Sequence, residues 1–202
     1  MRRRLSLLVL TVALIAASAG AALAAGFAPV AHNPADKLVR LPIDPERYDS
    51  AKDCRKHPTP GANAMVAWLQ SNAGGSFWGI MRCERWGKGR ASLHAEGRAI
   101  DWHLSVHSGS DRREAQRLIN LLLAPDRAGN PRALARRMGV EEIIWNCRYW
   151  GAGSESFRPY SVCYDSGGHP KRVDDTTAHR DHIHFGLSWP GAKLQTSFWT
   201  HR

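Results

Sequence analysis

The chain has 202 residues, of which 43% are hydrophobic, and a formal net charge of +10. That length suits one ordinary domain, and eight tryptophans favour a packed core and argue against a disordered chain. A basic surface attracts polyanions. The lysines and arginines are scattered, however, and accompany no DNA-binding motif, so nucleic acid is not the expected partner.

Residues 1–25 have the order of a secretory signal peptide. Arginines at positions 2–4 precede an apolar run from Leu5 to Ala19, and small residues at Ala22 and Ala24 match a cleavage site. The alternative is a retained membrane anchor, because about 20 apolar residues span a bilayer. No later stretch is apolar enough to do so. We expect cleavage and export, which predicts an extracellular, cell-wall-associated protein.

Cleavage changes the charge only modestly. Removing three of the 28 basic residues, against 18 acidic ones, leaves about +7. For an exported basic protein, an anionic cell wall is the simplest partner. After the signal, residues 26–50 contain four prolines and weak periodicity, which indicates an extended lead-in. Residues 51–202 would then form the single domain.

Periodicity predicts a helix and two strands in the first half of that domain. Within residues 61–74, Met65, Trp68 and Leu69 recur at helical spacing before a glycine pair. Residues 77–83 and 99–104 are typical of β-strands.

Two further helices are predicted. The first begins at Ser110 or Asp111, either of which can cap it, and ends before Pro125. A short second helix over residues 130–138 has proline in its first turn and Gly139 just past its end. The first of these carries the apolar stripe of a helix packed on a core, formed by Ala115, Leu118, Ile119 and Leu122.

The last third predicts strands around a long loop. Residues 140–150 and 160–164 each read as a strand, residues 165–181 as a Gly-, Asp- and Thr-rich loop, and residues 183–189 as a central strand. Helices gathered around non-consecutive strands predict an α+β domain with a largely antiparallel central sheet and flanking helices.

An even number of cysteines in an exported chain predicts two disulfides. We favour Cys147–Cys163, because both lie in runs that resemble neighbouring strands, and this leaves Cys54–Cys83. A zinc–thiolate site is the competing interpretation, but the chain has no C-x-x-C pair.

A first short segment, residues 92–101, carries residue types that bind metals. His94 lies on the loop that enters a predicted strand, and Asp101 lies on that strand. Gly97 permits a tight backbone path between them.

A second short segment, residues 179–185, reads His-Arg-Asp-His-Ile-His-Phe. His182 and His184 are two residues apart, so on a strand they face the same side. Together the two segments offer one carboxylate and several imidazoles, which is the composition of a metal site.

The spacing then becomes specific. The pattern S-x-H-x-x-G-x-A-x-D, followed much later by D-x-x-H and an overlapping H-x-H, resembles the D-alanyl-D-alanine metallopeptidases. That family includes cell-wall carboxypeptidases, phage endolysins and the vancomycin-resistance dipeptidase, and is similar in fold to lysostaphin-type peptidases and the hedgehog signalling domain. The resemblance covers roughly residues 61–189. Every fixed position of the first pattern is present, as Ser92, His94, Gly97, Ala99 and Asp101.

The resemblance implies a zinc ion held by His94, Asp101 and His184. It also implies that Asp181 acts as general base toward the attacking water, and the family position of Ser92 implies that it holds the loop before His94. His182, next to the metal without closing its fourth position, is expected to hydrogen-bond the tetrahedral intermediate. Endolysin-like members carry aspartate at the base position, as here, whereas dipeptidase-like members carry glutamate. In a regular strand Asp181 and His184 would face opposite sides, so we expect a bend near Asp181. The alternative is that Asp181 orients one of the ligand histidines from outside.

The family also implies an arginine, upstream of the first pattern, that holds the substrate carbonyl or carboxylate. Arg82 is the first choice, with Arg85 and Arg90 close behind, because no fixed spacing identifies it.

The expected function is therefore a secreted, monomeric zinc peptidase that hydrolyses an amide bond in peptidoglycan stem peptides, of carboxypeptidase or endopeptidase type. One alternative is a non-catalytic, zinc-containing module of the same fold that binds the cell wall. Another is a closed structural zinc site in which His182 is a fourth ligand.

Several other polar residues are assigned background roles. His103 shares a strand face with Asp101 and is a candidate to line the pocket. His179 reads as a loop residue, and the alternative is that it supports the metal site from behind the ligands. Three acidic side chains are interpreted as solvated charges: Glu96, Glu141 and Glu142.

Overall fold

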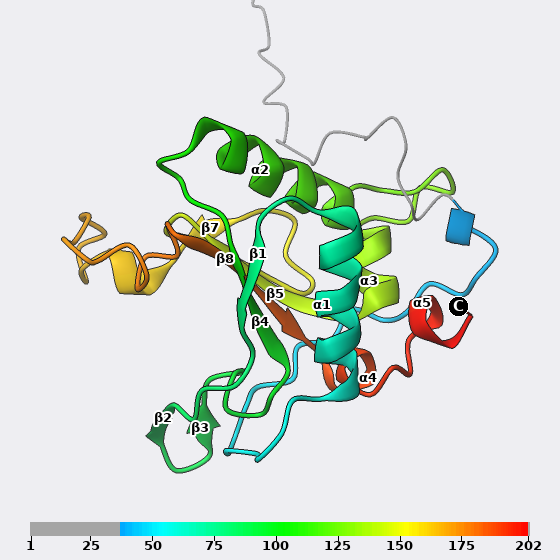
Figure 1. The fold of residues 1–202 in the computed structure, drawn as a ribbon, viewed down its shortest axis with the longest axis horizontal. Helices are drawn as coiled ribbons and strands as arrows, with labels where there is room; N and C mark the ends of the chain where they lie inside the picture. Colours follow the sequence, from blue (N-terminus) through cyan, green and yellow to red (C-terminus); the bar gives the residue numbers. More distant parts are fainter. Residues whose placement is uncertain (1–36, 202) are drawn as a thin grey trace, which may run out of the picture.

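The computed structural model describes residues 37–201, which form a six-stranded antiparallel sheet with helices packed against it (Figure 1). The predicted signal segment, residues 1–25, lies outside the described residues, as does the start of the lead-in. The α+β class with an antiparallel sheet is confirmed. In spatial order the strands are β1 (Ser76–Gly79), β4 (Ala99–His103), β8 (His182–Leu187), β5 (Val140–Trp145), β6 (Arg148–Gly151) and β7 (Arg158–Pro159).

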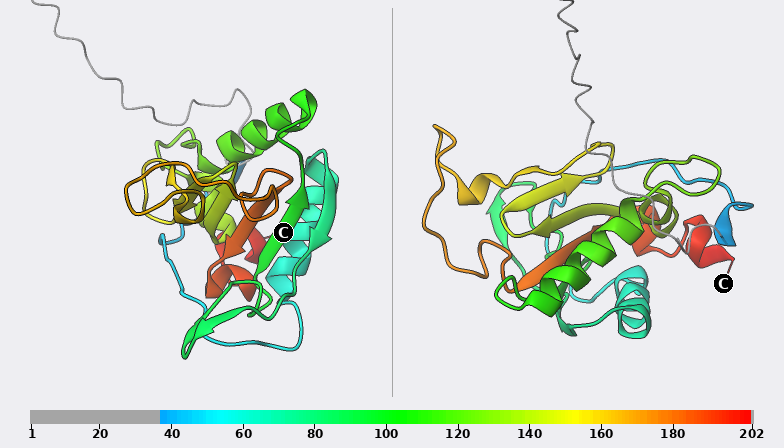
Figure 2. Two further views of the ribbon diagram at one scale, coloured as in Figure 1. Left: turned by 90° about the vertical axis from the view of Figure 1, so that its left-hand side faces the viewer. Right: turned by 90° about the horizontal axis from the view of Figure 1, so that it is seen from above.

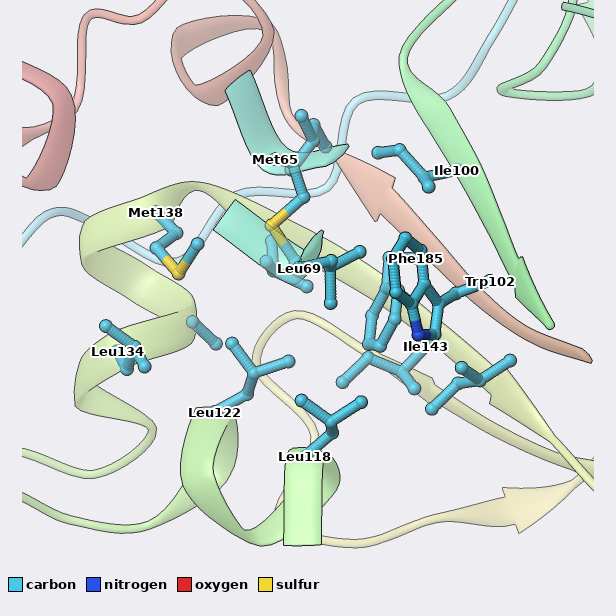
Figure 3. Packing of buried hydrophobic residues seen from close by; sticks show 14 of the residues in the cluster. Met65, Leu69, Ile100, Trp102, Leu118, Leu122, Leu134, Met138, Ile143 and Phe185 are labelled. Carbon is cyan, nitrogen blue, oxygen red and sulfur yellow. The ribbon is translucent and has the colours of Figure 1, made fainter. Parts of the chain in front are cut away.

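Three helices supply the apolar layer on one face of the sheet. They are α1 (Pro60–Asn72), α2 (Gly109–Leu123) and α3 (Ala133–Met138). Their leucines and methionines interdigitate with strand residues in one core cluster (Figure 3). Two short helices, α4 (Trp189–Ala192) and α5 (Ser197–Thr200), follow β8.

The sheet has two chemically different faces, because successive side chains on a strand point to opposite sides. In β8, Ile183 and Phe185 join the core cluster, while His182 and His184 point the other way. In β4, Ile100 and Trp102 likewise face the core. Residues 42–52, the end of the lead-in and the start of the domain, run along the polar face, opposite the helices (Figure 2).

A separate two-stranded hairpin stands beside the main sheet, below β4 in Figure 1. It consists of β2 (Arg85–Gly87) and β3 (Arg90–Ala91) and leads directly into the His94 loop. Its base is tied to the residue that follows the lead-in, because Ala91 N–H donates to the carbonyl of Ala51 at 3.1 Å.

Two predicted helix starts are wrong by a few residues. The N-cap of α2 is Ser108, whose hydroxyl accepts from Asp111 N–H at 3.3 Å, so the helix begins before Ser110. Pro131 precedes α3 and is not in its first turn, because Arg132 takes a left-handed φ of 53° and caps the helix. Gly139 ends α3 as predicted, with a φ of 75° that favours glycine.

The predicted strand over residues 140–150 is a hairpin. Asn146 and Cys147 both have positive φ, 48° and 58°, which is the backbone of a two-residue turn between β5 and β6. The predicted strand over residues 160–164 is also wrong, because Ser161–Cys163 form a 3₁₀ turn. Apolar runs of this length do not reveal where a chain reverses.

Both predicted disulfides form, Cys54–Cys83 and Cys147–Cys163, with Cα–Cα distances of 5.4 and 5.8 Å. The stated reason for the second pair is wrong, since Cys147 lies in a turn and Cys163 in a 3₁₀ turn. Disulfides persist in oxidising compartments, which these two suggest for this chain. Within residues 37–201, no helix has the length and hydropathy needed to cross a bilayer.

The buried guanidinium of Arg98 joins the lead-in, the His94 loop and the sheet. It donates to Glu96 at 2.7 Å, to the carbonyl of Leu187 at 2.5 Å, and also to Glu141 and the carbonyl of Asp49. Arg98 and Glu141 are both 0% exposed. The prediction that Glu96, Glu141 and Glu142 are solvated is therefore wrong, since all three are buried.

Arg98→Met should lower the free energy of unfolding by about 3–5 kcal/mol, because it leaves buried carboxylates without their counter-charge. Denaturant unfolding of the oxidised protein at neutral pH measures this. Arg117→Met is the control: Arg117 pairs with Glu114 at the surface, where a lost ion pair costs at most about 1 kcal/mol. Equal losses in the two variants would contradict the assignment.

Candidate metal centre

Three side chains converge on the polar face of the sheet. Nε2 of His94 lies 3.1 Å from Oδ1 of Asp101 and 3.0 Å from Nδ1 of His184. The third side of the triangle, from His184 Nδ1 to Asp101 Oδ1, is 3.2 Å. Donor atoms held about 2.0–2.2 Å from a shared tetrahedral ion lie about 3.3–3.6 Å apart. The three residues could therefore hold one metal ion, as predicted for them.

Strand pairing sets two of the three positions. β4 and β8 are antiparallel neighbours, and Asp101 lies directly opposite His184. The loop before β4 supplies His94 and turns at Gly97, where φ is +68°. A Cβ at Gly97 would lie 2.6 Å from the carbonyl oxygen of His57, so a glycine is required there.

Each histidine is oriented by a group behind it. Nδ1 of His94 lies 2.7 Å from the carbonyl oxygen of Ile80. A carbonyl only accepts, so Nδ1 carries the proton and Nε2 presents its lone pair to the centre. Ser92 holds the same loop as predicted, with its hydroxyl accepting from His94 N–H at 3.3 Å. Behind His184, Nε2 lies 3.2 Å from Oε1 of Glu142.

The electrostatics favour an ionised carboxylate at the centre. Burial alone would raise the pKa of Asp101, but hydrogen bonds and charge from His184 and His94 outweigh it, and the net shift is strongly downward. Burial alone would lower the pKa of His184. Its contacts with Asp101 and Glu142 reverse this and raise the pKa to about 9.

Asp181 and His182 form a hydrogen-bonded pair beside the three ligands. The chain bends at Asp181, just before β8, as expected. Nδ1 of His182 donates to Asp181 Oδ1 at 2.7 Å, while Thr176 donates to the other oxygen at 2.5 Å. His182 Nε2 is left facing Asp101 Oδ1 at 3.4 Å. These contacts give Asp181 the geometry of a residue that orients His182.

Of the three candidate arginines, Arg82 lies nearest the ligands. Its Nη1 is 3.7 Å from Asp101 Oδ2, and its Nε is 3.0 Å from Glu84. Arg85 instead pairs with Asp53 at the surface. Arg90 lines the same cleft as His94, on the hairpin side.

Two hollows meet at the centre. One contains His94 and His184 and is walled by Tyr48 of the lead-in and by Trp86, an indole that is 63% exposed. The other contains His94 and Asp101. Arg82 lines both hollows. Together the hollows form a cleft that is open to solvent, and the three candidate ligands border it.

Sequence reasoning missed Trp78 and Glu142 and left the role of His179 open. His179 is a loop residue, as expected, and its ring lies 4.6 Å from that of His182 and 5.7 Å from that of His184. Burial and the neighbouring histidines lower its pKa to about 2. Trp78 packs against His182 and also against His103, whose ring is 5.2 Å away. Glu142 was assigned to solvent, although its place on a buried strand was the available clue.

Comparison with known proteins gives one family. A family model described as the VldE C-terminal domain matches residues 54–174, which is more than half of the chain. The chain belongs to the VldE C-terminal domain family. No curated protein and no solved structure matches it.

The part of the chain that matches the VldE C-terminal domain includes His94 and Asp101 but ends before His184. The third ligand therefore joins the centre through the pairing of β8 with β4. The family name states no activity, so only the geometry of the domain bears on its chemistry.

The centre should bind one divalent metal ion per chain. His94→Ala removes a ligand atom, so it should weaken the affinity more than the about 10–100-fold typical of losing an outer partner. Competition titration with a chromophoric chelator measures this. His107→Ala is the matched control, because His107 is exposed and pairs with Asp175 away from the centre. Equal affinity for His94→Ala and wild type would refute the site.

Metal binding should also release a proton. Without metal the pKa of His184 is about 9, so below that pH the ring is charged and must lose a proton to become a ligand. The affinity should then rise with pH up to about 9, by as much as tenfold per pH unit. Calorimetry in two buffers of different ionisation enthalpy counts the proton. Enthalpies that are identical in both buffers would contradict the assignment.

Proposed function

We propose that this domain is a secreted zinc peptidase that hydrolyses an amide bond in peptidoglycan stem peptides, of carboxypeptidase or endopeptidase type. One observation carries the proposal: three donor atoms from distant parts of the chain lie within 3.2 Å of one another beside an oriented His182. The motif resemblance to D-alanyl-D-alanine metallopeptidases supports the substrate class.

Zinc suits the donor set of two imidazoles and one carboxylate. Three protein ligands with a cleft in front of them are typical of a catalytic site, whereas a structural site is closed by four. A bound zinc ion supplies Lewis acidity and activates water near neutral pH. The buried carbonyl of Ile80 and the carboxylate of Glu142 keep the two histidines in place for it.

Proton transfer is assigned to the His182–Asp181 pair. His182 Nε2 faces the ligands, and its Nδ1 proton is already donated to Asp181. His182 would accept the proton from the attacking water and deliver it to the leaving amine. Asp181 would hold the ring and stabilise its charged form. The pair refines the expectation of Asp181 as sole base, because both oxygens of Asp181 already accept hydrogen bonds.

Substrate binding is assigned to Arg82 and the cleft walls. Arg82 is half exposed and lies beside Asp101, where its guanidinium could hold a substrate carbonyl or carboxylate. Trp86 and Tyr48 offer exposed aromatic surface along the hollow that contains His94 and His184. The positive net charge favours an anionic cell wall as the surrounding polymer, and the disulfides agree with export to it.

The alternative of a non-catalytic wall-binding module is less well supported. Such a module needs metal ligands or a binding surface but no oriented base. The hydrogen-bonded chain from Thr176 through Asp181 to His182 would then have no role.

The test is turnover of defined muropeptides, with products identified by mass spectrometry. Wild-type protein should release a peptide or D-alanine, and a chelator should stop the release. His182→Ala should lower kcat by about 10²–10⁴-fold while the metal stays bound. Asp181→Asn should lower kcat less, because the ring of His182 remains.

His169→Ala is the control, since His169 is exposed and pairs only with Asp165 among the ion pairs of the described residues. Turnover that survives chelation would rule out zinc catalysis. Wall binding without any product would favour the binding module. Loss of metal in His182→Ala would indicate a closed four-ligand site.

A further inference from the structure

A buried carboxylate stands directly behind one of the candidate ligands. Glu142 lies on β5, the strand next to β8, and only 7% of it is exposed. Its Oε1 is 3.2 Å from Nε2 of His184, on the side of the ring away from the centre. The ring of His184 thus lies between two carboxylates, with Asp101 Oδ1 at 3.2 Å from Nδ1.

His184 must be a neutral imidazole to bind a metal, and a neutral imidazole carries a single N–H. With Nδ1 bound to an ion, that N–H lies on Nε2, 3.2 Å from the Glu142 carboxylate. Nε2 is buried and has no hydrogen-bond partner among the described residues, so Glu142 is the polar group that faces it. Glu142 therefore faces the nitrogen that keeps its proton when the ring binds metal.

Glu142 is itself held from two directions. The hydroxyl of Tyr48, in the lead-in, donates to Oε2 at 3.0 Å. Tyr149, on β6, also hydrogen-bonds to Glu142, and Arg158 stacks over its ring at 4.6 Å. With Oε2 accepting from the Tyr48 hydroxyl, Oε1 faces His184.

The backbone leaves room for this arrangement at Gly186, which lies opposite Glu142 in the sheet. A Cβ there would lie 3.0 Å from the Cβ of Glu142 and 2.3 Å from Cδ1 of Leu93. Leu93 precedes the ligand His94. The missing side chain therefore lets both the Glu142 carboxylate and the His94 loop pack against β8.

We propose that Glu142 is a positioning residue of the metal centre. It fixes the tautomer and the ring orientation of His184, and Tyr48 makes the lead-in part of that support. The inference rests on the metal centre and is independent of which bond, if any, the domain cuts.

The test compares divalent-metal affinity among variants of the full chain, with zinc measured by chelator competition. Glu142→Ala should bind zinc about 10–100-fold more weakly than wild type. Glu142→Gln should recover part of the loss, because its amide oxygen can still accept from Nε2. Tyr48→Phe, which removes only one hydroxyl, should cost less than Glu142→Ala.

Ile144→Ala is the matched control. Ile144 lies on the same strand, is buried, and pairs with His184 in register, but it offers no polar atom to the ring. Its removal should lower the melting temperature of the metal-free protein and leave zinc affinity within about threefold of wild type. Visible absorption of the cobalt-substituted protein should shift in Glu142→Ala and stay unchanged in Ile144→Ala.

Wild-type zinc affinity in Glu142→Ala would overturn the inference, as would an equal loss in Ile144→Ala. If Glu142→Ala does not fold, Glu142→Gln still decides, because the inference requires weaker binding in that variant too. Tight, Glu142-dependent zinc binding without muropeptide turnover would sink the peptidase proposal and leave this one standing. A wild-type chain that binds no divalent ion would overturn both.

Discussion

The antiparallel pairing of β4 with β8 is the constraint on which the centre depends. It places Asp101 opposite His184 although 83 positions separate them in the chain. A slip of one residue would turn every side chain of β8 to the other face. The imidazoles would then point into the core, and Ile183 and Phe185 would point into the cleft. Burial of those two apolar side chains therefore enforces the register that assembles the ligands.

Several charged side chains are buried on the polar face of the sheet. Arg98 follows Gly97 in the turn that supplies His94, and its guanidinium reaches the lead-in, β5 and the end of β8. Buried ion pairs seldom add much net stability, because desolvation offsets their attraction. Their geometry is specific, however. Arg98 ties the His94 loop to the strand next to β8, so the loop and the sheet hold one relative position.

The sequence predicted the elements that follow simple periodicity and missed those set by tertiary contacts. The apolar stripes of α1 and α2 and the alternation in β8 were readable, and so were the three candidate ligands, because their spacing matches a known pattern. The turn at Asn146 and Cys147 was not, since neither residue type demands positive φ. Glu142 was assigned to solvent because a lone acidic residue is usually exposed. Its burial depends on Tyr48 and His184, which are remote in sequence.

The two disulfides act on the surroundings of the centre and not on its ligands. Cys147–Cys163 holds the turn whose N–H groups, at Asn146 and Cys147, donate to the carbonyls of His179 and Ala178. That turn therefore fixes the chain just before Asp181. Cys54–Cys83 ties the chain just after the lead-in to the residue that follows Arg82. Asp101, His182 and His184 depend on the sheet, since they lie on the paired strands β4 and β8. Asp181 and Arg82 lie outside the strands, next to segments that the two disulfides hold. An oxidising compartment therefore bears on the proposed roles of Asp181 and Arg82 more than on the candidate metal centre.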